Sequence, residues 1–505
     1  MVSECDILRN AFAQAALIHP IPWRIIVAFD EFDVGDTTNH EHTRKLMCLS
    51  CSFLEFGKER LWSEDYWFTP VLVRNDMIKE AAGGWSAMLR LFLNLLLKGP
   101  TGISTAGLPL QLGVNVFLLR ANLSHLLADG AGHEIALEWS GASSIKPCFK
   151  HWNVLMIGSD VSSRDPSFVE LDCADPSRFR RAVTDDLHDI ADALFAMRAR
   201  YDAGIVRKGR MKQFQKACGF GCSPSGLLAD RQLGIDLINA STIDWMHTFL
   251  QDGAWTVEAA LLVEACRVKL GLTLDVLRNF FKQPWLFPRQ HQSTGVRLWR
   301  VFQDRRVSDR KIKASASEML QLYGFLRHFF EFHVWDRAEI RAEQDAFQAA
   351  CRSVDILLMA KRGRVDMREA ADMLEHSAKE HMEKHVNAHL KQFVKPKHHW
   401  QFDIAEQLRK DPWPIDCWVV ERLNKRAKAA SRNSVNTVRY ESSALSTVMA
   451  AHRSNLREKS SVDVALVGKT EVLAGSQALV ADKLMHHGMH ICFGDVAISS
   501  SLGVV

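Results

Sequence analysis

The apolar and polar positions of the first 140 residues follow a pattern typical of a mixed α/β core. Residues 23–30 (WRIIVAFD) form a short apolar run that ends in an acid, as a buried central strand does when it delivers a carboxylate to a sheet edge. The pattern predicts further strands at 46–56, 67–73 and 114–119, and helices at 76–97 and 130–139. This order of elements predicts a mixed sheet.

The pattern changes after about residue 175, where helical periodicity and good helix formers dominate. We therefore predict a large all-helical block, so that the chain is mostly helical overall. Its helices are predicted at 176–203, 254–282, 314–332 and 336–391. One more helix, strongly basic, is predicted at 419–431, and the pattern specifies little for the C-terminal tail, 446–505.

Composition and charge narrow the class of protein only slightly. The chain has 505 residues with a formal net charge of +4, so its overall charge does not indicate a class of binding partner. Eleven cysteines lie scattered without regular spacing, which favours reduced thiols inside the cell. The N-terminus has no signal-peptide pattern, and the most apolar stretch, 88–97, is too short and too charged to span a bilayer. We expect a nuclear or cytoplasmic protein, neither secreted nor in a membrane.

Three acids stand out by their positions in this pattern. Asp30 ends the first strand, Asp129 precedes a helix after a later strand, and Glu421 begins the basic helix. An RNase H-like nuclease takes two carboxylates from adjacent strands and a third from a helix packed against them, and holds two Mg²⁺ or Mn²⁺ ions. The alternative is structural: two turn residues at strand ends, and an acid that the helix dipole favours.

Several segments resemble, in order, the CACTA (En/Spm-like) and Plavaka-type group of DDE DNA transposases. The resemblance spans roughly residues 23–445. Its closing segments, KPKHHWQFDIAEQL and WVVERLNKRAK, resemble the group's His-rich strand and Glu-Arg helix. The matching segments before these are IIVAFDEFDVGD, HTRKLMCLSCSFLEFG, LLADGAGHEIALEWSGASSIKPCFKHWN and STIDWMHTFLQDG.

The resemblance implies an α/β RNase H-like core interrupted by a large all-α insertion, with Asp30, Asp129 and Glu421 as catalytic metal ligands. It also implies five parts of the chain. These are an N-terminal segment at 1–22, the first part of the core at 23–155, the helical insertion at 156–395, core completion at 396–445 and the tail at 446–505.

A second metal site is a further expectation. Where the group has a second cysteine, this chain has His151, giving the pair Cys148 and His151. Cysteine and histidine both bind Zn²⁺, but two more ligands are needed. Spacing does not assign them, although Cys173, Cys218 and Cys222 are candidates, and the alternative is a turn with a free thiol. The pair His398 and His399 can touch metal or DNA, but surface histidine pairs are common.

Basic segments suggest contacts with phosphate. One group is Arg422, Lys425, Arg426 and Lys428, beside Glu421; the other is Arg207, Lys208 and Arg210. The alternative for each is a solvated helix face. For His247 we favour a structural role, with Asp244 capping a helix, over a role beside the metals or in DNA contact.

The sequence therefore predicts a transposase or its remnant, which cuts and joins DNA by two-metal-ion phosphoryl transfer. Its partners are DNA, at transposon ends and target, and in a homodimer a second copy. Residues 1–22 show no DNA-binding module, which makes a truncated copy an alternative. A catalytically inactive, transposon-derived DNA-binding or scaffold protein is the second hypothesis, and a helical interaction protein is the third.

Overall fold

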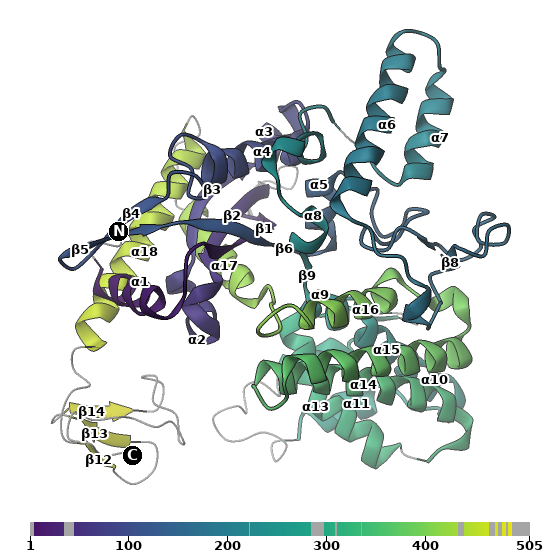
Figure 1. The fold of residues 1–505 in the computed structure, drawn as a ribbon. Coiled ribbons are helices and arrows are strands. Elements are labelled where there is room, and N and C mark those ends of the chain that lie inside the picture. Colours follow the sequence, from purple (N-terminus) through teal and green to yellow (C-terminus); the bar gives the residue numbers. More distant parts are fainter. Residues whose placement is uncertain are drawn as a thin grey trace.

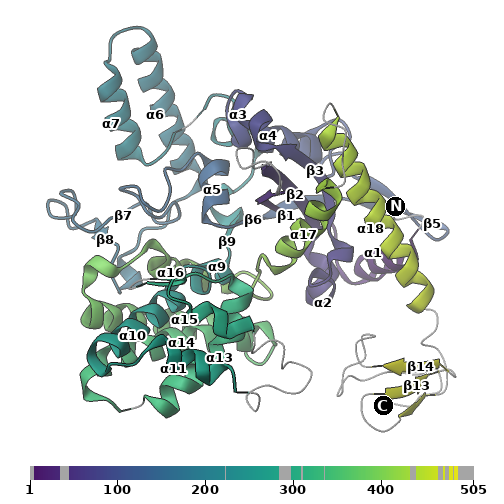
Figure 2. The same ribbon diagram turned by 180° about the vertical axis from the view of Figure 1, so that it is seen from behind.

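The computed structural model describes residues 5–34, 45–221, 223–283, 297–308, 311–334, 336–432, 439–463, 470–472, 477–480 and 483–486. Figures 1 and 2 show an α/β part with a helical part beside it, and the chain is mostly helical. Within the described residues, no helix is long and apolar enough to cross a membrane.

A five-stranded mixed sheet forms the centre of the α/β part. Its strands run in the order β3-β2-β1-β6-β9. The pairs β1–β2 and β2–β3 are antiparallel, whereas β1–β6 and β6–β9 are parallel. The bounds are β1 Trp23–Asp33, β2 Lys45–Phe53, β3 Phe68–Arg74, β6 Ala121–Ala128 and β9 Ser241–Ile243. The apolar run at the start of β1 is buried on both faces of the sheet, as expected of a central strand.

Helices cover this sheet. Helix α17 (Trp418–Arg432) packs against β1, and α18 (Tyr440–Asp463) packs against β3 and crosses in front of the sheet in Figure 2. Helix α5 (Gly130–Leu137) begins directly after β6 and contacts α4 (Gly84–Leu93). Gly83, in the left-handed region at φ 85°, separates α4 from α3 (Asn75–Glu80), so the predicted helix at 76–97 is broken at its glycines.

The helical part consists of packed helices, most of which are joined by short connections; the longest connection lies between α11 and α13. Helix α15 lies between α14 and α16, and α14 also packs on α10. The bounds are α10 Ala254–Leu270, α11 Leu274–Phe281, α13 Ala316–His333, α14 Arg341–Lys361, α15 Met367–His389 and α16 Pro396–Leu408. Separately, α6 (Thr184–Asp202) and α7 (Lys208–Cys218) form a hairpin that projects away from the sheet in Figure 1.

One expected strand lies in a different sheet, and two expectations about elements are wrong. The strand expected at 114–119 is confirmed as β5 (Asn115–Leu119), and it pairs with β4 (Leu108–Leu112) in a hairpin separate from the main sheet. The range expected to be all helical, 156–395, contains β9, the fifth strand of the main sheet. The segment expected as a His-rich strand is α16, because Pro396 suits a first helical turn and the last four residues, 405–408 (AEQL), are good helix formers.

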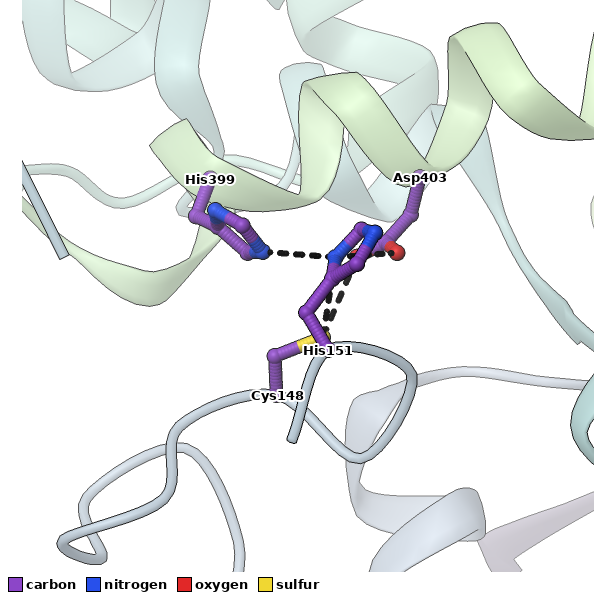
Figure 3. Close-up of side chains that lie close together, drawn as sticks. All are labelled: Cys148, His151, His399 and Asp403. Carbon is purple, nitrogen blue, oxygen red and sulfur yellow. Dashed lines mark hydrogen bonds and ion pairs between the residues drawn. The ribbon is translucent and has the colours of Figure 1, made fainter. Parts of the chain in front are cut away.

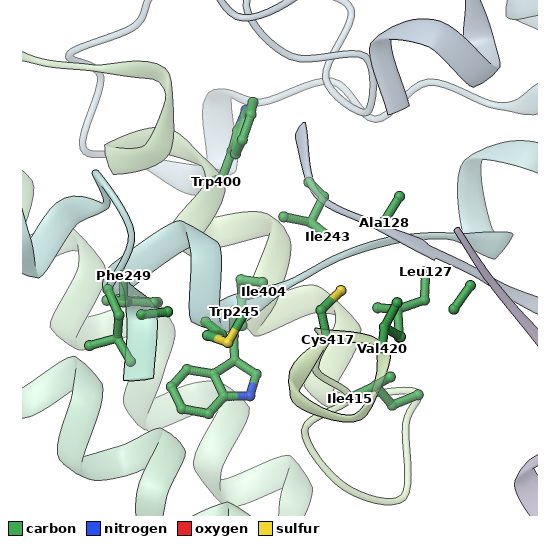
Figure 4. Close-up of a cluster of buried hydrophobic side chains, with 14 of the residues drawn as sticks. Leu127, Ala128, Ile243, Trp245, Phe249, Trp400, Ile404, Ile415, Cys417 and Val420 are labelled. Atoms are coloured by element: carbon green, nitrogen blue, oxygen red, sulfur yellow. The ribbon is translucent and has the colours of Figure 1, made fainter. Parts of the chain in front are cut away.

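An apolar core joins the two parts of the molecule. Helices α9 (Trp245–Phe249), α16 and α17 meet there beside the ends of β6 and β9 (Figure 4). Its buried side chains include Leu127, Ala128, Ile243, Trp245, Phe249, Trp400, Ile404, Ile415, Cys417 and Val420. This core fixes the end of the sheet against the first turn of α17, which carries Glu421.

Candidate functional site

The structure brings Asp30, Asp129 and Glu421 together, although they lie far apart in the sequence. Asp30 is on β1, Asp129 directly follows the adjacent parallel strand β6, and Glu421 lies in the first turn of α17, which packs against β1. Their carboxylates are close enough that the negative charges of Asp129 and Glu421 both raise the pKa of Asp30. We call these three residues the acid centre.

Asp129 is held in place by the start of α5. Its Oδ1 accepts a hydrogen bond from the Gly132 backbone N–H at 2.7 Å, so it is the N-cap of the helix. The two nearby glycines permit close packing. A Cβ on Gly132 would lie 2.7 Å from the Cβ of Ala128, and one on Gly130 would lie 2.8 Å from the ring of Trp400. The sequence ADGAGHE therefore sets the carboxylate tightly between β6 and α16.

Asn424 connects the third element to the first. It lies one turn after Glu421 on α17, and its Nδ2 donates to Asp30 Oδ2 at 2.7 Å. The side chain is buried, and its Oδ1 has no hydrogen-bond partner in the structure. The bond holds α17, and with it Glu421, at a fixed place relative to the end of β1.

The acid centre carries unbalanced negative charge. Burial, together with the charges of Asp129 and Glu421, raises the pKa of Asp30 to about 7. Burial also raises the pKa of Glu421, and Asp244 and Asp416 add to this effect, whereas His247 and Lys425 oppose it. Neighbouring carboxylates of this kind attract divalent cations, because negative charges are costly to hold near one another without one. Among the described residues, the three acids do not form one of the groups whose ligand atoms all lie within 4.8 Å of one another, so a single ion would not contact all three in this arrangement.

His247 lies beside the acid centre, and its Nε2 is 3.9 Å from Glu421 Oε1. Its Nδ1 is 2.5 Å from Asp244 Oδ2. Burial lowers the pKa of His247, but the hydrogen bond and charge of Asp244 outweigh this effect and raise the pKa above its ordinary value. Asp244 also caps α9, as the sequence led us to expect, by accepting the N–H groups of Met246 and His247. The structural role we favoured for this pair and a place at the site therefore coexist.

Lys397 is a cation that sequence reasoning missed. It lies in the first turn of α16, and its Nζ donates to the backbone oxygen of Gln251 at 2.6 Å. Burial lowers its pKa to about 8, while the charges of Asp252, Asp129 and Asp244 act in the opposite direction. One cation near Asp129 thus comes from α16, and no short motif marks it in the sequence.

A second group of side chains, Cys148, His151, His399 and Asp403, can hold a metal ion (Figure 3). All four are at most 2% exposed. His151 Nδ1 lies 3.0 Å from His399 Nε2 and 3.3 Å from Asp403 Oδ1, and Cys148 Sγ lies 3.4 Å from Asp403 Oδ2. Ligands at 2.0–2.3 Å from one tetrahedral ion are separated by about 3.3–3.6 Å, so these distances suit a metal.

The partners of Cys148 and His151 are therefore His399 and Asp403, not the cysteines considered from the sequence. Cys173 and Cys218 do not belong to this group, and Cys222 lies outside the described residues. The missed signal is the spacing of His399 and Asp403, which puts both on one face of α16. It was hidden because the segment was interpreted as a strand. His398, adjacent to His399, is also fully buried, so this pair is not a surface pair.

The predicted basic residues have different environments. Arg422 Nε donates to Glu64 Oε1 at 2.9 Å, and Arg426 also pairs with Glu64, so both are tied to the neighbouring 3₁₀ turn, Glu64–Tyr66. Lys425 is exposed, and its positive charge lowers the pKa of Glu421. Lys428 is half-buried. The other three, Arg207, Lys208 and Arg210, are exposed where the connection from α6 enters α7.

No protein-family model matches the chain, and the comparison with curated proteins finds no match. The functional proposal therefore rests on the arrangement of the residues.

Proposed function

We propose that the protein is a DDE-type DNA transposase, or a descendant of one, with an RNase H-like core. The observation that carries the proposal is the convergence of Asp30, Asp129 and Glu421 from two adjacent parallel strands and a packed helix. A two-metal nuclease requires carboxylates from these elements near one another, and strand-end turn residues and a helix-start acid have no reason to lie together. The helical part, inserted between β9 and α17, agrees with the resemblance seen in the sequence.

Asp30 and Asp129 would hold two divalent ions, Mg²⁺ or Mn²⁺, and Glu421 would complete the site. When bound, such ions activate the attacking oxygen and stabilise the leaving oxygen in phosphoryl transfer. Asn424 orients Asp30 through its 2.7 Å hydrogen bond. Asp244 fixes the ring of His247, which keeps the imidazole Nε2 directed toward Glu421. Asp30 and Asp129 are only partly buried, which leaves room for a phosphate to approach.

DNA would be bound mainly through its phosphates. Lys425 is the exposed cation nearest to Glu421 in sequence on α17, and Arg207, Lys208 and Arg210 offer a second contact where α7 begins. Arg422 and Arg426 already have an acidic partner in Glu64, so their contribution to binding would be smaller. In this proposal the protein acts in the nucleus, where its DNA lies.

The group of Cys148, His151, His399 and Asp403 would bind Zn²⁺ in a structural role. A thiolate and a carboxylate with two neutral imidazoles carry two negative charges, which neutralise Zn²⁺ in a fully buried place. His151 Nε2 lies 3.2 Å from Glu406 Oε1, the kind of outer contact that orients a metal-bound imidazole. The ion would fix the 148–151 turn to α16, whose Trp400 packs against Gly130 next to Asp129.

The experiment measures Mg²⁺- or Mn²⁺-dependent nicking and strand transfer on supercoiled plasmid DNA by the full chain. We expect Asp30→Asn, Asp129→Asn and Glu421→Gln each to lower the rate by about 10³-fold or more. Asparagine remains a good N-cap at position 129, so this change tests charge rather than folding. Glu31→Gln is the matched control, because Glu31 is the next residue of β1 and contacts Lys45 and Asn75 instead.

Equal cleavage by the wild type and any of the three acid variants would reject the assignment. A wild type that shows no metal-dependent cleavage but binds DNA less tightly as salt rises would favour the second function, an inactive transposon-derived DNA-binding protein.

A further inference from the structure

Helix α15 carries three histidines, His381, His385 and His389, spaced four residues apart. Residues at this spacing lie above one another on a single helix face. The face is turned inward: His381 and His385 are fully buried, and the side chain of His389 is only 7% exposed. Neither the acid centre nor the group around Cys148 uses any of these residues.

All three histidines meet one buried carboxylate, that of Glu258 on α10. Glu258 Oε1 lies 2.9 Å from His381 Nε2 and 2.5 Å from His385 Nδ1. Glu258 Oε2 lies 3.2 Å from His389 Nε2. Glu258 is itself fully buried, which is rare for a glutamate unless charged or metal partners compensate it.

A fourth imidazole, His398, comes from the first turn of α16. Its ring centroid is 4.3 Å from that of His385 and 5.4 Å from that of His381. His398 is 0% exposed, and its Nδ1 lies 3.0 Å from the Lys395 backbone nitrogen, whose N–H can donate to it, and 3.3 Å from the Lys395 backbone oxygen, to which it can donate. In the tautomer that donates from Nδ1 to that oxygen, the lone pair of Nε2 is free to face the cluster, because a neutral imidazole carries only one N–H.

Hydrogen bonding within the protein does not satisfy this cluster. His385 Nε2 and His398 Nε2 are both buried without a hydrogen-bond partner. Each such atom costs free energy in an apolar interior, and native proteins rarely leave two in one place. The remaining nitrogen of His381, Nδ1, is 3.1 Å from Gln401 Oε1, so that ring already has an outer partner on the side away from Glu258.

We propose that Glu258, His381, His385 and His398 bind a divalent transition-metal ion, with Zn²⁺ as the favoured ion, and that this ion joins α10, α15 and α16. One ligand atom from each residue lies within 4.8 Å of the others. Three imidazoles and one carboxylate oxygen form a ligand set that Zn²⁺ accepts. Gln401 and the Lys395 carbonyl would serve as the outer hydrogen-bond partners that orient metal-bound imidazoles.

The site would be structural rather than catalytic. Its four ligands are all 0% exposed, so no substrate can reach an open coordination position. His389 would hold the second oxygen of Glu258 rather than bind the ion, because it bonds Oε2 and not Oε1. The proposal does not depend on the acid centre or on any activity of the protein.

The test measures the Zn²⁺ content of the full chain by mass spectrometry after dialysis against metal-free buffer. We expect His385→Ala and Glu258→Gln to hold one equivalent of Zn²⁺ less than the wild type. His376→Ala is the matched control, because His376 is an exposed histidine on the same helix, and it should lose none. A folded His385→Ala protein with the wild-type Zn²⁺ content would overturn the proposal.

A second measurement separates this site from the group around Cys148 and does not depend on whether the His385 variant folds. X-ray absorption of the wild-type protein loaded with Zn²⁺ should show ions in a shell of nitrogen and oxygen only. If sulfur is found in the shell of every bound ion, or no Zn²⁺ is bound, the proposal is wrong. Co²⁺ substitution adds a check, since the thiolate charge-transfer band of the Cys148 group should persist in His385→Ala.

Discussion

The acid centre and the two buried metal-ligand groups collect similar residue types in opposite surroundings. Asp30 and Asp129 are partly buried at the end of the sheet, and their negative charges repel one another. The groups around Cys148 and Glu258 are almost fully buried, and most of their ligands are imidazoles, which can be neutral. Both arrangements suit metal ions, but only the first leaves a side open to another molecule.

The acid centre is destabilised by burial and by the repulsion between its carboxylates, whereas the buried groups join elements of the fold. At the acid centre the folded chain accepts an electrostatic cost, visible in the raised pKa of Asp30, to present carboxylates where a phosphate can reach them. In the buried groups the side chains converge from elements distant in sequence and fix those elements to one another. Substitutions in the two regions should therefore change stability in opposite directions.

The largest effect on stability is expected from His399→Ala. This change opens the group around Cys148 and leaves Asp403 with a buried carboxylate that has lost a ligand partner. We expect the free energy of unfolding in Zn²⁺-containing buffer to fall by about 3–5 kcal/mol. Denaturant unfolding followed by circular dichroism measures this change.

The same substitution at an exposed position, His376→Ala, should change the unfolding free energy by less than about 0.5 kcal/mol. A loss of that small size for His399→Ala would mean that the group around Cys148 contributes no metal-dependent order, and the contrast between the two regions would fail.

The opposite sign is expected for Asp30→Asn in metal-free buffer. The folded-state pKa of Asp30, about 7, lies above its ordinary value of 3.8, so the folded protein holds this proton more tightly than the unfolded chain. Wild-type stability should thus be fully present below about pH 4 and decline as pH rises to about 7, by up to about 4 kcal/mol. The variant lacks this decline and should be the more stable protein at pH 8.

Unfolding measured at pH 5 and at pH 8 with EDTA tests this difference, with the exposed Asp160→Asn as control. Mg²⁺ should restore wild-type stability at pH 8 and have a smaller effect on Asp30→Asn. If Asp30→Asn is less stable than the wild type at both pH values, burial and neighbouring charge do not destabilise the ionised carboxylate, and the first half of the comparison is incorrect.

The smallest effect is expected from single cations near the acid centre. Lys425 is exposed, so Lys425→Gln should weaken DNA binding at low salt and lower the slope of log K against log salt by about one. Arg422 is paired with Glu64, and Arg422→Gln should leave the slope nearly unchanged. Fluorescence anisotropy with a labelled duplex measures both slopes. A larger change for Arg422 than for Lys425 would reverse their assigned roles.

The sequence predicted the elements whose pattern is local and strong. The apolar run of β1, the strands β2 and β3, and helix α17 are confirmed within a few residues. Strand β6 was missed because Asn122, Ser124 and His125 interrupt its apolar pattern, although His125 is buried against Asp411. Strand β9 has only three residues, too few for any periodic signal.

The candidate site shows the same limit. Asp30, Asp129 and Glu421 could be selected because each stands at the end or start of a predicted element, and the resemblance ordered them. Their convergence, and the partners of Cys148, depend on contacts across more than 200 residues that no local pattern encodes. The spacing of the histidines on α15 was visible in the sequence, but their shared contact with Glu258 is formed only in the folded chain.

The first turn of α16 has a consequence for how this chain can vary. Four successive residues of this turn contact four different neighbours. Lys397 contacts the Gln251 carbonyl, and His398 contacts the histidines of α15. His399 contacts the turn at 148–151, and Trp400 contacts the start of α5. Successive residues of a helix differ by about 100° in direction. Inserting or deleting one residue in this turn would rotate all four away from their neighbours at once, so length changes must be accommodated in the surrounding loops instead.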